Sequence, residues 1–305
     1  MPESDIAVRV EPAGPERHDV PLDGRSGFVR VADRQVHYLE WGPADGPPVL
    51  AMHGGGQTSY MFEETGAALR DRYHVIAPDL PHHGESDPLA DPERFGRIAL
   101  AETVPPLLDE FGVQQAAIIG ASLGGIVGLT LAARWPERVR AIVLIDVGHR
   151  LEESGVRRII DFLGRHESFG SLDEAAAAIA EYLPHRKRTD PERLRRNLRQ
   201  RADGRWVWKH GLGRASNQLT SQATDWQDIL AGLGEDVARV HAPVLVLRGA
   251  RSDVLSSAGA EEVAELLPNA EVVEVGDAGH LAAGDNPTST IDLVRRFLDG
   301  LDDPG

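Results

Sequence analysis

Cysteine is absent from this chain of 305 residues. Its absence excludes disulfides, thiolate metal sites and cysteine nucleophiles. Long apolar runs are missing too, because no stretch reaches the roughly 18 residues that a membrane helix needs, and the mean hydropathy is -0.27. Basic side chains are few: 32 stand against 48 acidic ones, and the net charge of -16 disfavours binding to nucleic acid and to anionic membranes. We therefore expect a globular protein with neither kind of partner.

The N-terminal residues give few structural signals. Residues 1–25 mix proline, glycine and charge without a sustained period, which predicts an N-terminal arm with no role in chemistry. This segment also lacks the basic start and the apolar core of a secretion signal. We therefore expect a cytoplasmic protein.

Alternating strand and helix patterns follow. The β-prone runs at 27–31 and 35–41 predict an antiparallel hairpin at a sheet edge. Continuous apolar runs, typical of strands buried on both faces of a parallel sheet, lie at 49–52, 75–77, 116–119, 141–145, 244–247 and 272–273. Segments of helical length lie at 59–69, 97–111, 123–135, 257–267 and 288–298. This alternation predicts an α/β fold with helices on both faces of the sheet.

A long insertion interrupts the alternation at residues 149–235, which is too long for a connecting loop. We predict a helical cap subdomain there, inserted into a core domain formed by 26–148 and 236–305. Ser171 and Glu174 have capping-box spacing before a predicted helix that ends near Leu183. A second helix is predicted to start at Pro191 and to carry Leu194 and Leu198.

The cap is also locally basic. Residues 185–214 contain nine arginines and two lysines against three acidic side chains. Such a segment could steer an anionic substrate or pair with an acidic face of a partner. The interpretation we favour is a solvated surface that forms salt bridges with the acidic core domain.

A G-x-S-x-G pattern at Gly120–Gly124 lies between an apolar strand and a helix of small residues. A sharp strand-to-helix turn needs glycines because its backbone is crowded, and it exposes the serine hydroxyl beside amide groups at the helix N-terminus. A serine becomes nucleophilic when a base removes its proton, so the pattern calls for a histidine held by a carboxylate. Ser122 is therefore the candidate nucleophile.

Asp253 and His280 are the candidate acid and base. Each follows the carboxyl end of a predicted parallel strand, as Ser122 does, so the three side chains are expected along one edge of the sheet. The chain order of serine, acid and histidine matches a known arrangement of this machinery. Asp146, at the end of the preceding strand, is an alternative acid.

A glycine run, Gly54–Gly56, follows His53 at the end of another predicted strand. Its backbone can approach a substrate closely, and a tetrahedral oxyanion needs two convergent N–H donors. We expect the amide of Gly55, or alternatively that of Gly56, to act with the amide of Leu123. His53 is expected to orient this loop.

These motifs, with the segment Ala77–Ser86, resemble the α/β-hydrolase fold superfamily, in the branch that has a helical cap inserted after the sixth strand. The resemblance implies a mostly parallel, eight-stranded sheet flanked by helices, with Ser122 as nucleophile, Asp253 as acid and His280 as base. It implies no cofactor. The chain departs from the family at His82, where the family usually has a glycine.

Four side chains are candidates for the substrate pocket. His53 and His82 flank the predicted catalytic edge, and Trp206 and Trp208 fall on one side of the cap segment if it is extended. Packing in the core is the competing interpretation for the tryptophans, and exposure at the surface for His82. No metal is expected, because His82 and His83 lack supporting ligands.

The resulting hypothesis is a serine hydrolase that cleaves a carboxylic ester or related acyl bond of a small to medium, largely apolar molecule through an acyl-enzyme. We expect a small-molecule substrate and a monomer or homodimer. Carbon–carbon bond hydrolases and cofactor-free oxygenases of the same fold keep similar residues, so both remain alternatives. A ligand-binding or signalling protein with slow turnover is a third.

Overall fold

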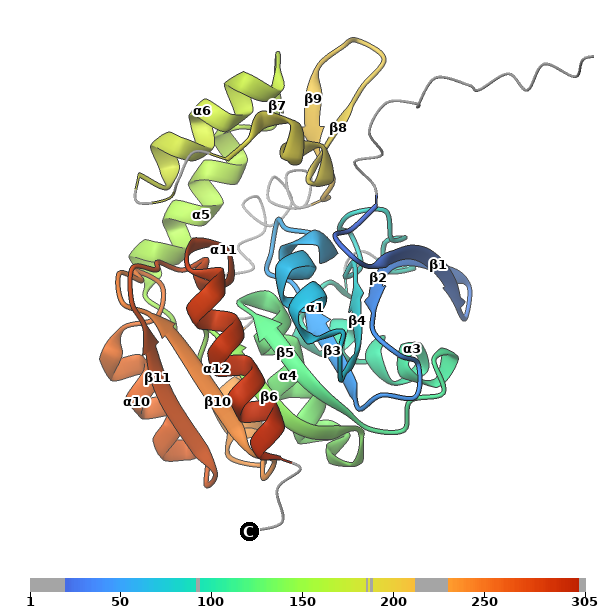
Figure 1. Ribbon diagram of the computed structural model, residues 1–305. Helices are drawn as coiled ribbons and strands as arrows, with labels where there is room; N and C mark the ends of the chain where they lie inside the picture. The colour runs from blue at the N-terminus through green and yellow to red at the C-terminus, as the bar shows by residue number, and fades with distance from the viewer. Residues whose placement is uncertain (1–19, 92–93, 185, 187–188, 212–229, 302–305) are drawn as a thin grey trace, which may run out of the picture.

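The computed structural model describes residues 20–91, 94–184, 186, 189–211 and 230–301. Its main sheet has eight strands in the order β1-β2-β4-β3-β5-β6-β10-β11 (Figure 1). The strands are β1 Arg25–Val31, β2 Arg34–Trp41, β3 Pro48–Met52, β4 His74–Pro78, β5 Ala116–Ala121, β6 Val139–Ile145, β10 Val244–Gly249 and β11 Ala270–Val275. Strand β2 pairs antiparallel with β1 and β4, and the remaining pairs are parallel. The predicted α/β fold and edge hairpin are thus confirmed, while residues 1–19 of the predicted arm lie outside the described residues.

Helices cover both faces of this sheet (Figure 1). Side chains alternate along each strand, so Ile118 and Leu144 pack into one apolar cluster while their neighbours Ile119 and Val143 pack into another on the opposite face. The helices of the first face are α2 Arg97–Ala101, α3 Val104–Glu110, α4 Leu123–Arg134, α9 Leu233–Val237 and α10 Ser257–Leu266, and those of the second are α1 Glu63–Leu69, after the 3-10 turn η1 Ser59–Phe62, and α12 Pro287–Gly300. Burial on both faces explains the continuous apolar runs.

Proline changes one predicted helix. The segment 97–111 was predicted as a single helix, but the structure divides it between α2 and α3. Pro105 and Pro106 lie in the first turn of α3, where their missing N–H groups cost nothing, and they cannot continue a helix that arrives from α2. None of the described helices is long and apolar enough to span a membrane.

The inserted segment contains helices and a small sheet. Helices α5 Glu153–Arg165 and α6 Leu172–Tyr182 are followed by the 3-10 helix η4 Pro191–Arg196, and β7 Ser168–Phe169, β8 Leu198–Gln200 and β9 Trp206–Trp208 form a three-stranded antiparallel sheet. In Figure 1 these elements lie together at the end of the main sheet from which the short helix α11 Ala282–Asp285 also emerges. The prediction of a purely helical cap was therefore incomplete, because it missed the three-stranded sheet.

Two local predictions in this segment had different outcomes. The capping signal is confirmed: Ser171 Oγ accepts the Glu174 amide at 3.1 Å, and the Glu174 carboxylate accepts the Gly170 amide at 2.6 Å. The second helix is confirmed only in part: the 3-10 helix η4 starts at Pro191 and carries Leu194 as predicted, but it ends at Arg196, and Leu198 belongs to β8. Leu198 is instead buried with Phe169 and Trp206 in a core of the cap's own.

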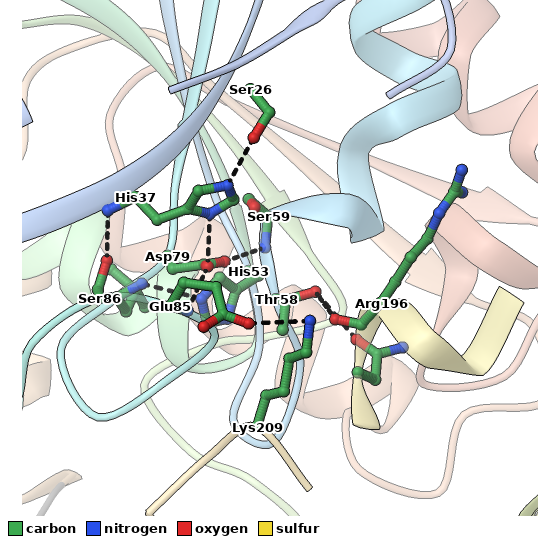
Figure 2. Close-up of polar contacts among 12 residues, drawn as sticks. Ser26, His37, His53, Thr58, Ser59, Asp79, Glu85, Ser86, Arg196 and Lys209 are labelled. Carbon is green, nitrogen blue, oxygen red and sulfur yellow. Dashed lines mark hydrogen bonds and ion pairs between the residues drawn. The ribbon is translucent and has the colours of Figure 1, made fainter. Parts of the chain in front are cut away.

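Acidic side chains of the core domain hold the basic part of the cap. Glu63, almost fully buried at the start of α1, forms ion pairs with Arg193, at 3.2 Å, and with Arg196. Lys209 Nζ lies 2.9 Å from a carboxylate oxygen of Glu85 (Figure 2). These contacts agree with the interpretation that the basic segment forms salt bridges with the core domain.

Candidate active site

Ser122 occupies a strained turn between β5 and α4. Its φ of 47° and ψ of -115° lie in a region that residues with a side chain rarely adopt. Close packing explains the flanking glycines: a Cβ at Gly124 would lie 2.0 Å from the Met52 carbonyl oxygen, and one at Gly120 would lie 2.5 Å from the Gly125 Cα. The strain and the crowding hold Ser122 at the carboxyl edge of the sheet, as the motif predicts.

His280 is held by Asp146. The two residues follow β11 and β6, and His280 Nδ1 lies 2.8 Å from Asp146 Oδ2. Asp146 is fully buried, and its other oxygen accepts the Gly249 amide at 2.8 Å. Because a carboxylate only accepts hydrogen bonds, Nδ1 carries the proton of a neutral His280, which leaves Nε2 free to take a proton from a nucleophile.

The structure contradicts the choice of Asp253 as the acid. Asp253 is partly exposed and forms an ion pair with Arg158 of α5 at 3.1 Å. Strands β6 and β10 are parallel neighbours, so both aspartates start from the same edge, but Asp146 follows its strand directly. Asp253 lies beyond a turn closed by the Ser252 amide and the Gly249 carbonyl oxygen, and this turn carries it toward α5.

The glycine loop after β3 lies over Ser122, because a Cβ at Gly54 would be 3.4 Å from the Cβ of Ser122. The Gly56 amide donates to His83 Nε2 at 3.2 Å, so this N–H is already occupied and the alternative oxyanion donor is wrong. Among the described residues, no hydrogen-bond acceptor is found for the amides of Gly55 and Leu123. These two N–H groups remain the candidate oxyanion hole.

Comparison with known proteins gives the family. The profile of the alpha/beta hydrolase fold family matches residues 47–287. The chain belongs to this family. It is 28% identical over 281 residues to the esterase Rv0045c of Mycobacterium tuberculosis, with 88% of each chain covered. It is 30% identical over 290 residues to 3-hydroxybutyrate-oligomer hydrolase of Cupriavidus necator, with 90% of this chain and 98% of that protein covered.

Solved structures agree. The crystal structure of E-2-(acetamidomethylene)succinate hydrolase matches with a TM-score of 0.79 at 25% identity, and the match covers 90% of this chain and 99% of that one. The α/β hydrolase described here is thus an esterase-like hydrolase, and the resemblance of its motifs to the α/β-hydrolase fold superfamily is confirmed.

Both histidines predicted to flank the pocket have structural partners in this α/β hydrolase. His53 is fully buried; its Nδ1 donates to the Gly54 carbonyl oxygen at 2.8 Å and its Nε2 accepts the Leu80 amide at 2.9 Å. Burial lowers the pKa of His53, so it stays neutral and fixes the glycine loop. It orients the loop as predicted and, being buried, does not line a pocket.

His82 lies where the family usually has glycine, and its φ of 67° gives the reason, because glycine adopts this left-handed backbone without strain. Its Nε2 accepts the Leu89 amide at 3.2 Å and its ring packs edge-on against Phe95. The side chain of His82 therefore points toward Leu89 and Phe95. Among the described residues, no group of three or more His, Cys, Asp or Glu side chains gathers to hold a metal ion.

The cap tryptophans are packed as in a protein core. Trp206 is buried in the cap's own core and the Arg195 guanidinium lies 4.7 Å from its ring centre, so the competing interpretation of core packing fits this residue. Trp208 donates its indole N–H to the His166 carbonyl oxygen at 2.7 Å and stacks on His210. His210 was not singled out in the sequence. Its two ring nitrogens are buried and find no hydrogen-bond partner among the residues that the structure describes, and Nε2 would lie 3.6 Å from a Cβ at Gly56. Burial lowers its pKa to about 4.

A buried network centred on Asp79 supports the glycine loop (Figure 2). Its carboxylate accepts His37 Nδ1 and the Ser59 amide, each at 2.7 Å, and the Glu85 amide at 3.0 Å. Ser26 Oγ lies 3.0 Å from His37 Nε2, so the network contains a second Ser–His–Asp chain, whose members lie on β1, on β2 and directly after β4. Burial acts to raise the pKa of Asp79, but the hydrogen bond and charge of His37 outweigh it and bring the pKa to about 2.

We expect this network to make the free energy of unfolding depend on pH in the acidic range. Because the pKa of Asp79 is about 2 in the folded protein and 3.8 in the unfolded chain, its ionised form adds about 2 kcal/mol of stability above pH 4. That contribution is lost as the pH falls from about 4 to about 2. Urea unfolding of wild type and Asp79→Asn should therefore differ most near neutral pH and converge in acid.

The matched control is Asp33→Asn, which changes an exposed aspartate in the turn between β1 and β2. This variant should follow the wild-type acid transition. A constant difference between wild type and Asp79→Asn from pH 7 to pH 2 would contradict the role given to the Asp79 charge.

Proposed function

We propose that Ser122, His280 and Asp146 form a catalytic triad that hydrolyses a carboxylic ester or a related acyl bond through an acyl-enzyme. The observation that carries the proposal is the hydrogen bond of 2.8 Å between His280 and a fully buried Asp146. It lies at the sheet edge where the strained turn presents Ser122. A serine, a base and a buried carboxylate at one edge are the parts that acyl transfer requires.

The chemistry follows from the roles of these groups. Ser122 Oγ attacks the carbonyl carbon while its proton moves to His280 Nε2, and Asp146 stabilises the imidazolium. The amides of Gly55 and Leu123 hold the oxyanion. His280 then gives its proton to the leaving alcohol, and water, activated by the same histidine, releases the acid.

Among the hydrogen bonds of the described residues, none joins Ser122 Oγ to His280 Nε2. Catalytic hydrogen bonds are often long without substrate and shorten in the reactive complex. We infer that a bound acyl group brings the two side chains into line.

A small to medium, largely apolar substrate fits the surroundings of the glycine loop. The Leu163 methyl groups of α5 lie 3.2 and 3.3 Å from a Cβ placed at Gly56, and Phe162 beside it stacks on Tyr182. Two relatives carry the names 3-hydroxybutyrate-oligomer hydrolase and 3-oxoadipate enol-lactonase. These names support acyl bonds as the class of bond cleaved here.

The test is covalent labelling of the folded protein with a fluorophosphonate, followed by peptide mapping and p-nitrophenyl ester assays. We expect one adduct per chain, on Ser122, and loss of ester turnover in proportion to labelling. An adduct on Ser26, whose hydroxyl also meets a His–Asp pair, would contradict the proposal. So would a folded protein that hydrolyses esters while Ser122 stays unlabelled. Labelling without turnover would instead favour a binding protein or carbon–carbon bond chemistry.

A further inference from the structure

We propose that Ser252 is a positioning residue that donates its hydroxyl hydrogen bond to Asp146 and thereby sets the direction in which the carboxylate faces His280. The inference rests on the proposed function, because it concerns the acid of that triad. Ser252 lies in the turn after β10, directly before the aspartate that the sequence favoured as the acid. Nothing in the chemistry of the triad itself requires a serine there.

The direction of the Ser252 hydroxyl is fixed by its neighbours. The amides of Val254 and Leu255 both donate to Ser252 Oγ, each at 3.1 Å. A hydroxyl has two lone pairs and one hydrogen, so these amides fill its capacity to accept. The hydrogen must then point along the remaining contact, which leads to Asp146 Oδ2.

The same oxygen of Asp146 therefore receives two side-chain donors, Ser252 and His280. The Gly249 amide holds the other oxygen at 2.8 Å. A carboxylate with a donor on each oxygen cannot rotate about its Cβ–Cγ bond without losing bonds in a buried site, where an unmade hydrogen bond is costly. Asp146 is thus held before any substrate arrives.

The shared oxygen has an electrostatic consequence. A hydrogen bond from Ser252 withdraws charge from Asp146, so the carboxylate stabilises a protonated His280 less than it would alone. Loss of the hydroxyl should therefore raise the pKa of His280, whereas a purely structural serine should leave it unchanged. The charged groups of the adjoining elements stay in place in this comparison: Asp285 of α11, Arg186 beside it, and the ion pair of Arg251 with Asp277.

The experiment compares Ser252→Ala with Ser252→Thr and with a matched control, Ser256→Ala. Ser256 also lies after β10 and accepts one backbone amide, that of Gly259 at 3.1 Å, as the N-cap of α10. Removing it should cost stability without touching Asp146. Two quantities are measured: the pKa of His280 by NMR titration, and the pH profiles of kcat and kcat/KM for a p-nitrophenyl ester.

We expect Ser252→Ala to raise the pKa of His280 by roughly half a pH unit or more and to lower kcat about tenfold, with a smaller change in KM. The acidic limb of kcat/KM should move to higher pH by the same amount, because it reports the base in the free enzyme. Ser252→Thr keeps the hydroxyl and should restore both values toward wild type. Ser256→Ala should match wild type in both.

An unchanged or lowered pKa of His280 in Ser252→Ala would overturn the inference, and so would equal losses of kcat in Ser252→Ala and Ser256→Ala. The NMR titration needs no turnover, so it tests the role of Ser252 even if the protein proves not to be an esterase. Failure of Ser122 to be labelled would reject the proposed function. A normal titration in Ser252→Ala beside a working Ser122 would reject the positioning role alone.

Discussion

Ser122→Ala should lower kcat for ester hydrolysis by about four to six orders of magnitude, because no other group can form the acyl-enzyme. The fold should be unaffected. Alanine keeps the Cβ, so the backbone strain at φ 47° is the same in both proteins. Steady-state assays with p-nitrophenyl esters and circular dichroism of both proteins check the two parts of this expectation.

The matched control is Ser26→Ala, because Ser26 Oγ also contacts a histidine that an aspartate holds. This variant loses a contact at the edge strand β1 and should keep wild-type kcat. If Ser26→Ala lost turnover while Ser122→Ala kept it, the proposed nucleophile would be rejected.

Asp146→Asn should lower kcat by about four orders of magnitude while Asp253→Asn stays within about twofold of wild type. Asparagine has nearly the shape of aspartate, but one of its terminal atoms is an N–H₂ donor. Both oxygens of Asp146 accept hydrogen bonds, from His280, Ser252 and Gly249. The side-chain nitrogen of an asparagine at this position would therefore face another donor in either orientation. His280 would then favour the wrong tautomer, with its acceptor nitrogen turned away from Ser122.

Asp253→Asn loses only an ion pair with Arg158 at a partly exposed site, and such pairs contribute little. Parallel measurement of kcat/KM for the two variants distinguishes the acids. A larger loss in Asp253→Asn than in Asp146→Asn would show that Asp253, the acid that the motifs predict, holds His280 during catalysis.

The elements of the sheet could be predicted because their signals are local. Runs such as 116–119 and 141–145 are apolar at every position, and strands β5 and β6 lie there, buried on both faces. Errors arose where a pattern fits more than one structure. Pro191 and the leucines that follow it satisfy a helical spacing, yet Leu198 pairs with Trp208 in the cap sheet, and pairing between distant segments leaves no local trace.

The sequence by itself determined the strand-to-helix turn that presents Ser122 and the strand end that His280 follows. Gly120 and Gly124 are required by backbone crowding at a strand-to-helix turn, and this requirement is visible in the order of the residues. The glycine run Gly54–Gly56 could be found for the same reason. That the Gly56 amide already donates a hydrogen bond could not be predicted, because its acceptor, His83, lies on a second loop that is distant in the sequence.

Only the tertiary structure decided which aspartate accepts the hydrogen bond of His280. Asp146 and Asp253 both follow parallel strands that lie side by side, so motif and chain order fit either one. The choice depends on the direction of one turn after β10, which brings Ser252 to Asp146 and carries Asp253 to the cap helix α5. A catalytic motif specifies residue types along the chain, whereas a hydrogen bond requires positions in space that packing of the whole domain fixes.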